Sequence, residues 1–337
     1  MPLTEGQRKA LLELRAQASG GVNPIGSSMP FDKRAHLPMT NIPDDIRARV
    51  EIAPPLSTPF PLLDHSALKK PERVPIFYYS LRSEDHTQCA PEDTKVVFYI
   101  HGGGNISGHP ADVQYTTLLA AILRALATGK GNSVPCIIVA PCYRLSTIPD
   151  NTFPAALQDI LAAYDFVIGQ GYKAFNITIA GDSAGGNHAV VLTHLALQSN
   201  RPSPVGVIAF APASIQSYDN LSEHAKAQAD NDLRPLSRYQ RASSAYIGNT
   251  DFAPTDPLIS GSFIAFTASW PRTLILVGTG DQLIDGSREL EKRLAALKRP
   301  VELVEYDECP HLWWLAMSIF TEEIRDAVQR VARFVLG

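Results

Sequence analysis

Cysteine is scarce in this chain of 337 residues, and no two cysteines have the spacing of a metal site. The four are Cys89, Cys136, Cys142 and Cys309, and no Cys-x-x-Cys pair occurs. Neither a zinc site nor a disulfide framework is therefore indicated. We expect buried or incidental thiols and no bound metal.

Long apolar runs and clustered basic residues are also missing. No stretch approaches the roughly 20 residues that a bilayer span needs, and residues 1–8 lack the basic-then-apolar order of a secretory signal. The formal net charge is -4 and lysine and arginine are scattered, so nothing indicates binding to nucleic acid or to an anionic membrane surface. We expect a cytoplasmic protein that acts on a small molecule, and its oligomeric state stays open, a homodimer included.

The chain alternates short β-branched runs with longer helical patterns. Continuous apolar runs predict strands buried on both faces, and the amphipathic or Ala/Leu-rich stretches between them predict helices. This alternation indicates an α/β fold with a mostly parallel sheet covered on both faces. Residues 74–79 predict an additional edge strand, because Pro75 cannot donate to a sheet ladder. The other predicted strands are residues 95–100, 136–140, 176–180, 205–210, 272–277 and 301–306, and the predicted helices are residues 115–127, 154–168, 184–198, 287–297 and 319–335.

Two regions break this alternation. Residues 1–60 begin with a capped helix and continue into a proline-rich stretch, and residues 214–255 are polar and helix-prone. We expect both to be cap elements that fold together over the strand ends as a lid, with surface decoration as the alternative. Residues 61–213 and 256–337 then form the core domain.

A serine lies at a predicted strand-to-helix turn. Gly181-Asp182-Ser183-Ala184-Gly185-Gly186 follows the predicted strand 176–180 and opens the predicted helix 184–198. The small residues let strand and helix approach closely, and such a turn lifts a hydroxyl out of the sheet. A Gly-x-Ser-x-Gly match alone is more often an ordinary loop, so the assignment of Ser183 as a nucleophile depends on its partners.

The partners of Ser183 are sought among the later strand ends. A serine hydroxyl needs a base to remove its proton, and the base needs an acid to orient it. Asp281 and His311 each follow a predicted strand, in that order. Of the nine histidines, only His311 lies on a loop that follows a strand and comes after both Ser183 and Asp281 in the chain. Asp285 is the nearest rival of Asp281, but its place before a helical run is typical of a helix-cap carboxylate.

A second motif, His101-Gly102-Gly103-Gly104-Asn105, follows the predicted strand 95–100. Successive glycines expose N–H groups that can donate to an oxyanion, and no side chain blocks the approach. A phosphate-binding loop is the competing interpretation, but the Gly-Lys-Ser/Thr ending and the dinucleotide spacing are absent. We expect His101 to anchor the loop by hydrogen bonding rather than to transfer protons.

Together these motifs resemble the hormone-sensitive-lipase group of α/β-hydrolases, the family IV esterases. The resemblance implies an α/β-hydrolase fold with a mostly parallel eight-stranded sheet flanked by helices, and a helical cap. It also implies the triad Ser183, Asp281 and His311, with oxyanion donors from the backbone N–H groups of Gly103, Gly104 and Ala184. The matches are His-Gly-Gly-Gly at 101–104, Tyr-Arg-Leu at 143–145, Phe-Pro-Ala-Ala at 153–156, Asp159, the elbow at 181–186, Asp-Pro-Leu-Ile-Ser at 256–260, Leu-Ile-Leu-Val-Gly at 274–278 leading to Asp281, and His311.

The chain departs from the family pattern at three places. Asn105 replaces an aromatic or bulky apolar residue, and its amide either contacts a polar substrate or holds the loop. Residues 146–152 replace the usual continuation of the Tyr-Arg-Leu segment, so the family role of that loop is not transferred. Trp313 and Trp314 either pack the final helix or form a wall of the pocket. Asn105, Trp313 and Trp314 are therefore candidate substrate-binding residues.

These features predict hydrolysis of carboxylic esters, of short to medium acyl chains or of a small metabolite, through an acyl-enzyme and without a cofactor. Two alternatives stay open. One is a biosynthetic enzyme on the same scaffold, performing dehydration, cyclisation, lactone opening or acyl transfer, which Asn105 and residues 146–152 motivate. The other is a ligand receptor, because plant gibberellin receptors resemble this family without a working triad, although the intact His311 argues against it.

Overall fold

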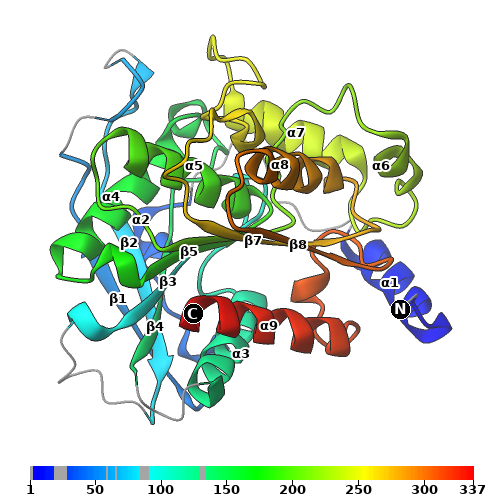
Figure 1. Cartoon of the computed structure of the whole chain (residues 1–337), viewed down its shortest axis with the longest axis horizontal. Coiled ribbons are helices and arrows are strands. Elements are labelled where there is room, and N and C mark those ends of the chain that lie inside the picture. The colour runs from blue at the N-terminus through cyan, green and yellow to red at the C-terminus, as the bar shows by residue number, and fades with distance from the viewer. Residues whose placement is uncertain (1–2, 19–28, 58–59, 65–66, 84–90, 130–133) are drawn as a thin grey trace.

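An eight-stranded sheet runs through the middle of the molecule, with helices on both faces (Figure 1). The computed structural model describes residues 3–18, 29–57, 60–64, 67–83, 91–129 and 134–337. The spatial order of the strands is β1-β2-β4-β3-β5-β6-β7-β8. They are β1 (Ile46–Ala53), β2 (Val74–Leu81), β3 (Lys95–Ile100), β4 (Cys136–Pro141), β5 (Ile177–Asp182), β6 (Gly206–Phe210), β7 (Arg272–Gly278) and β8 (Val301–Tyr306).

Most neighbouring strands are parallel. β1 and β4 both run antiparallel to β2, and all other pairs from β4 to β8 are parallel. The six runs that predicted strands correspond to β3 to β8, and β4, β5 and β6 are buried along their whole lengths. The predicted α/β fold with a mostly parallel eight-stranded sheet is confirmed.

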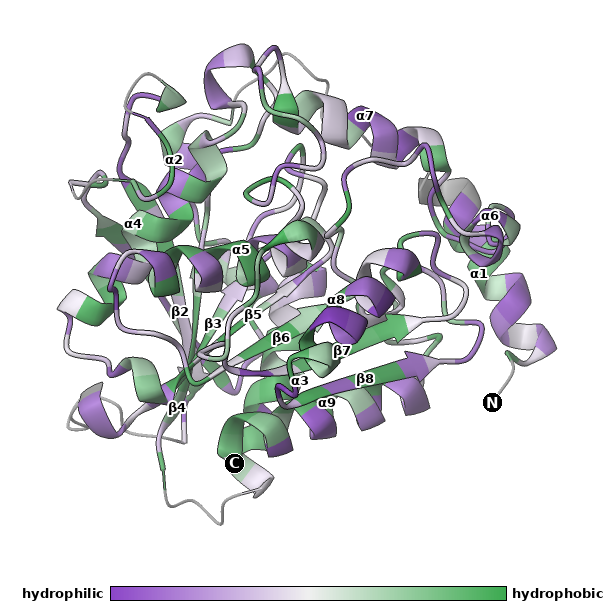
Figure 2. Ribbon diagram, turned by 45° about the horizontal axis from the view of Figure 1, so that its top comes forward, coloured by the Kyte–Doolittle hydropathy of each residue, from purple (hydrophilic) through white to green (hydrophobic). Residues whose placement is uncertain are grey.

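Helices form one layer on each face of this sheet. α3 (Val113–Gly129) and α9 (Thr321–Leu336) pack against each other on one face, and α4 (Ala155–Gly169), α5 (Ala184–Gln198) and α8 (Ile284–Ala296) cover the other. Each layer encloses its own cluster of buried apolar side chains. In Figure 2 the strands are largely hydrophobic, whereas hydrophilic residues mark the outer sides of α8 and α9.

The remaining helices lie outside these two layers. They are α1 (Glu5–Ala18), α2 (Phe31–Arg34), α6 (Glu223–Ala227) and α7 (Leu236–Ile247). α1 contacts the segment before α7, because the Arg15 guanidinium donates to the carbonyl oxygens of Ala229 (3.0 Å) and Asp230. Short 3-10 helices occur at Met39–Asn41, Pro91–Asp93, Pro149–Asn151, Ala174–Asn176, Gly261–Phe263 and Trp313–Leu315.

Two predictions about the first strands were wrong. Ile46–Ala53, inside the predicted cap 1–60, is the edge strand β1 of the main sheet. Its charged residues face solvent at the edge, so it has no continuous apolar run. β2, expected at an edge, lies between β1 and β4; Pro75 is tolerated there because it precedes the first residue in register with β4.

The described residues contain no helix long and apolar enough to cross a membrane. They also contain no group of three or more His, Cys, Asp or Glu side chains placed to hold a metal ion. Cys136, Cys142 and Cys309 are buried, and Cys89 lies outside the described residues.

Candidate active site

Ser183 lies on the turn between β5 and α5. Its backbone has φ +53° and ψ -118°, a conformation that costs a non-glycine residue about 1–3 kcal/mol. Three backbone hydrogen bonds hold it: Ser183 N–H donates to the Phe210 carbonyl (2.8 Å), and the Ser183 carbonyl accepts from Ala213 N–H (2.9 Å) and Asn187 N–H (3.1 Å). A Cβ on Gly185 would lie 2.0 Å from the Ile100 carbonyl oxygen, so a glycine is needed where helix and strand meet.

Two later loops bring an imidazole and a carboxylate to this serine. His311 Nε2 lies 2.8 Å from Ser183 Oγ, and His311 Nδ1 lies 2.8 Å from Asp281 Oδ2. Asp281 follows β7 and His311 follows β8, and both are buried. Asp285 turns away and accepts hydrogen bonds from Ser222 N (2.7 Å) and Ser222 Oγ (2.5 Å). The structure thus brings together the three side chains that the sequence predicted.

The imidazole of His311 lies among buried carboxylates. Burial alone would lower the pKa of His311, but the negative charges of Asp281, Asp232 and Asp182 outweigh that effect and raise its pKa above the usual value. A proton taken by Nε2 is therefore stabilised on the ring. This is the property that a general base next to a serine needs.

Asp232, on the segment before α7, is a member of this cluster that sequence reasoning missed. Its Oδ1 accepts from His311 N–H (3.2 Å), and its Oδ2 accepts from Gln282 N–H (3.0 Å) and from the Tyr239 hydroxyl (3.1 Å). Burial, and next the charge of Asp281, raise the pKa of Asp232 to about 6. The only signal in the sequence is its place in the Asp230-Asn231-Asp232 run, which is typical of a turn.

The glycine loop is fixed to the serine turn through Asp182. Asp182 Oδ1 accepts from Gly102 N–H (2.9 Å) and from the Tyr99 hydroxyl (2.9 Å). Burial raises the pKa of Asp182 to about 6. Gly103 (φ +106°) and Gly104 (φ +64°) have conformations that favour glycine, and within the described part of the chain their N–H groups donate to no carbonyl or side chain. Asp182 belongs to the elbow motif, but nothing in the motif assigned it this role.

His101 and Ala184 complete the loop and the turn. The His101 ring stacks on Tyr143 with centroids 4.3 Å apart, and its Nδ1 lies 2.8 Å from the Gly102 carbonyl oxygen. Burial lowers the pKa of His101 to about 3, so the ring is neutral and suited to anchoring the loop. Ala184 is the first residue of α5, where an N–H group has no partner within the helix.

A cavity of about 260 Å³ opens beside Ser183 and His311. The glycine loop lines it, together with Arg234 and the α7 residues Arg238, Tyr239 and Ala242. A Cβ on Gly104 would lie 2.7 Å from the Cβ of Ala242, so the loop and α7 are in close contact. The predicted cap segment 214–255 therefore contributes directly to this cavity.

The three candidate pocket residues do not line the cavity. Asn105 is buried, and its Oδ1 lies 2.5 Å from His188 Nε2, so its amide holds the loop to α5. Trp313 and Trp314 are fully buried; Trp314 packs its ring edge-on against the His311 ring, with centroids 5.6 Å apart. Their burial and this contact favour the packing role over the pocket wall, the two alternatives that the sequence left open.

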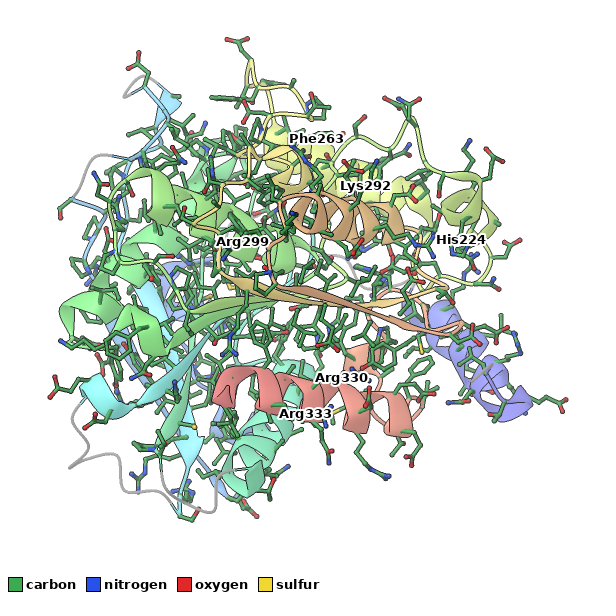
Figure 3. The ribbon with its side chains drawn as sticks, viewed as in Figure 1. His224, Phe263, Lys292, Arg299, Arg330 and Arg333 are labelled. Carbon is green, nitrogen blue, oxygen red and sulfur yellow. The ribbon has the colours of Figure 1, made fainter. Side chains whose placement is uncertain are left out.

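The segment between β6 and β7 rests on the loop that contains Asp281. His224, labelled on α6 in Figure 3, places its Nε2 2.9 Å from the Thr279 carbonyl oxygen. The Arg234 carbonyl accepts from Gln282 Nε2 (2.9 Å), and the Ser222–Asp285 hydrogen bonds add a third connection. This segment is thus attached directly to the loop next to His311.

A serine on a strand-to-helix elbow, a histidine and an aspartate from later strand ends, and a glycine loop after an earlier strand define a site of the serine-hydrolase class. The model of the family described as alpha/beta hydrolase fold matches residues 97–315, and the chain belongs to this family.

Several known proteins with similar sequences or structures are named as esterases or hydrolases. An acetyl-hydrolase of Streptomyces hygroscopicus is 29% identical over 224 residues, which cover 66% of this chain and 70% of that protein. Esterase LipI of Mycobacterium tuberculosis is 31% identical over 218 residues, which cover 63% of each chain. The crystal structure of an esterase from the bacterial hormone-sensitive lipase family, 23% identical, superposes with a TM-score of 0.74 over 99% of this chain and 98% of that one. The predicted resemblance to the hormone-sensitive-lipase group is confirmed.

Proposed function

We propose that Ser183, His311 and Asp281 hydrolyse a carboxylic ester through an acyl-enzyme. The protein is a carboxylic ester hydrolase, the activity that its family and its named relatives support. The observation that carries the mechanism is the continuous line of hydrogen bonds from Asp281 through His311 to Ser183, with both distances 2.8 Å.

Acylation begins when Ser183 Oγ attacks the ester carbonyl carbon while its proton moves to His311 Nε2. Asp281 accepts the Nδ1–H hydrogen bond and so selects the tautomer with a free Nε2. The carbonyl oxygen becomes an oxyanion, for which the N–H groups of Gly103, Gly104 and Ala184 are the proposed donors. The C–O bond then breaks, and the alcohol leaves with the proton from His311. In deacylation water takes the place of the alcohol and releases the acid.

The 214–255 segment and α1 are proposed to form a cap over this site. Support comes from the Arg15 hydrogen bonds between α1 and residues 229–230, and from the α7 residues that line the cavity. The cavity of about 260 Å³ fits an ester with a short to medium acyl chain. No step requires a cofactor. A cytoplasmic location stays a prediction.

Asn105 no longer supports the biosynthetic alternative, which also rested on residues 146–152. Asn105 suggested a polar contact with a specialised substrate, but its amide bonds to His188. The relatives named as hydrolases also favour ester hydrolysis over dehydration or cyclisation.

Replacement of the nucleophile tests the mechanism. S183A is expected to lower kcat on aryl esters by about a million-fold, as removal of a triad nucleophile does. The measurement is turnover over a chain-length series of aryl esters, with circular dichroism to show that the variant folds. Ser287→Ala is the matched control, because Ser287 is also buried and its Oγ has no hydrogen-bond partner among the described residues. Turnover retained by S183A would contradict the proposed mechanism.

A further inference from the structure

Two arginine side chains line the cavity beside Ser183. Arg234 lies just before α7 and Arg238 lies in its first turn, and both line the cavity together with residues of the glycine loop. Each is partly buried. Among the described residues, Asp112 is the only carboxylate that lines the cavity. The wall therefore carries more positive than negative charge at the place where a substrate would lie.

The positive charge of Arg238 lies in an unfavourable environment. Its guanidinium forms no ion pair or hydrogen bond with the described part of the chain. Burial lowers the pKa of Arg238, and repulsion from the charge of Arg234 lowers it further. The charge of Arg241 acts in the same direction. A cation in the first turn of α7 is also disfavoured by the helix dipole, and no acidic residue there offsets it. An anion in the cavity would relieve all of these costs.

The carboxylates around His311 do not fill this role. Asp281, Asp232 and Asp182 are buried and do not line the cavity. Asp281 and Asp232 accept hydrogen bonds from His311 and from backbone N–H groups, and Asp182 accepts from Gly102 N–H. Their negative charge serves the imidazole and the glycine loop, and it leaves the positive charge of Arg238 to act on a ligand.

From this placement we propose that the preferred substrate is an ester that carries an anionic oxygen group, of carboxylate type, which binds to Arg238 and Arg234 while Ser183 attacks the ester carbonyl. A guanidinium group matches the geometry of a carboxylate with two parallel N–H donors. The inference rests on the proposed function, because it assigns the ester to the same serine. It adds the charge of the substrate, which the triad does not determine.

Two matched ester pairs test the proposal and locate the anionic group. On the alcohol side, 4-acetoxybenzoate is compared with the neutral 4-acetoxybenzamide. On the acyl side, monoethyl succinate is compared with ethyl 4-methylpentanoate, which has a similar shape without the charge. The readout is the ratio of kcat/KM for the anionic ester to that for its neutral partner, measured by product release. We expect a ratio of about ten or more in at least one pair, which falls as salt is added.

Substitutions connect this ratio to the two arginines. R238Q and R234Q should each lower it several-fold, whereas R238K should retain part of it. Both kcat/KM values in the ratio come from the same variant, so a general loss of activity lowers both and leaves the ratio unchanged. The matched control is R325Q: Arg325 is exposed on α9 and lies outside the cavity, so the ratio should stay at the wild-type value. D112N should raise the ratio, because it removes the carboxylate from the cavity wall.

Two results would overturn the proposal: equal kcat/KM for the anionic and neutral esters in both pairs, or a ratio that R238Q and R234Q leave unchanged. S183A separates this failure from a failure of the proposed function. If S183A abolishes hydrolysis of the neutral esters and wild type shows no anionic preference, the serine mechanism holds and only the substrate inference fails. If S183A still hydrolyses both members of a pair, the proposed function itself fails.

Discussion

His311 is surrounded by more negative charge than its hydrogen-bond partner alone supplies. Asp281 accepts from its ring, and Asp232 accepts from its backbone N–H. The two carboxylates come from segments on either side of β7, and both are buried. The base is therefore held at the ring and at the main chain by two separate acids.

The pH dependence of D232N tests this arrangement. The imidazole must be neutral to take the serine proton, and the charge of Asp232 helps to raise the pKa of His311. Without that charge the pKa of His311 falls, so the acidic limb of the kcat/KM profile should move to lower pH. We also expect kcat to drop about tenfold, because the histidine loop is held less well. The measurement is a pH–rate profile with an aryl ester.

D230N is the control for this experiment. Asp230 belongs to the same segment, but it is exposed and does not contact His311. Its variant should keep the wild-type profile. A D232N profile that superimposes on that of the wild type would show that Asp232 does not influence the base.

At this scale the sequence predicted the residues that strand order brings together and missed those that depend on distant contacts. Ser183, Asp281 and His311 each follow a predicted strand, and parallel strands bring their carboxyl ends to one edge. Asp232 is on an irregular segment 79 residues from His311 along the chain, where no local pattern reveals a partner. Asn105 allowed two roles, and only the position of His188 separates them.

Helix α5 and strand β3 are in close contact at Gly185. Gly185 leaves no room for a Cβ against the Ile100 carbonyl oxygen, which belongs to a strand and cannot move alone. G185A should lower the free energy of unfolding by about 1–3 kcal/mol, as overpacking does, and should also displace the serine turn. Urea unfolding followed by circular dichroism measures the first effect, and aryl ester turnover measures the second.

Gly169, the last residue of α4, provides the opposite case. A Cβ added at this position would have no neighbouring atom within 4 Å. G169A should therefore be neutral or should stabilise by up to about 1 kcal/mol, because alanine favours the helix more than glycine does. Equal losses of stability in the two variants would argue against a special requirement at the elbow.

For the molecule as a whole, one buried ion network joins the N-terminal segment to the core. Asp159 on α4 accepts from Arg34 Nη2 (3.0 Å) and from Arg144 Nη2 (2.8 Å), and the three side chains are at most 4% exposed. D159N would remove the buried carboxylate from two buried guanidinium groups and leave them, among the described residues, only the more distant and exposed Glu72. We expect the free energy of unfolding to fall by about 3–5 kcal/mol, measured by urea denaturation.

The surface pair Arg288–Glu305 gives the comparison for this network. Its side chains are 39% and 32% exposed, and its shortest N–O distance is 2.7 Å. E305Q should cost no more than about 1 kcal/mol, since solvent screens the pair. If D159N cost as little as E305Q, the buried network would not hold the N-terminal segment.

The fold was predictable wherever burial is complete. Strands buried on both faces have uninterrupted apolar sequences, so β3 to β7 stand out, whereas β8 is half-buried and was found from its β-branched residues and its place in the strand–helix alternation. β1 was missed because one of its faces meets solvent and carries Arg and Glu, which gives it the composition of a loop. For the same reason residues 46–53 of the predicted cap segment 1–60 belong to the sheet.

Asp232 belongs to the segment that shapes the cavity, and its carboxylate accepts from the histidine loop. The segment that determines the substrate range therefore also supports the catalytic histidine. A chimera that takes residues 214–255 from another esterase would change the cavity wall and remove an acceptor from the base in one step. Transplants of this segment should keep an aspartate at position 232, and recombination libraries that ignore it will lose activity even when every triad residue is intact.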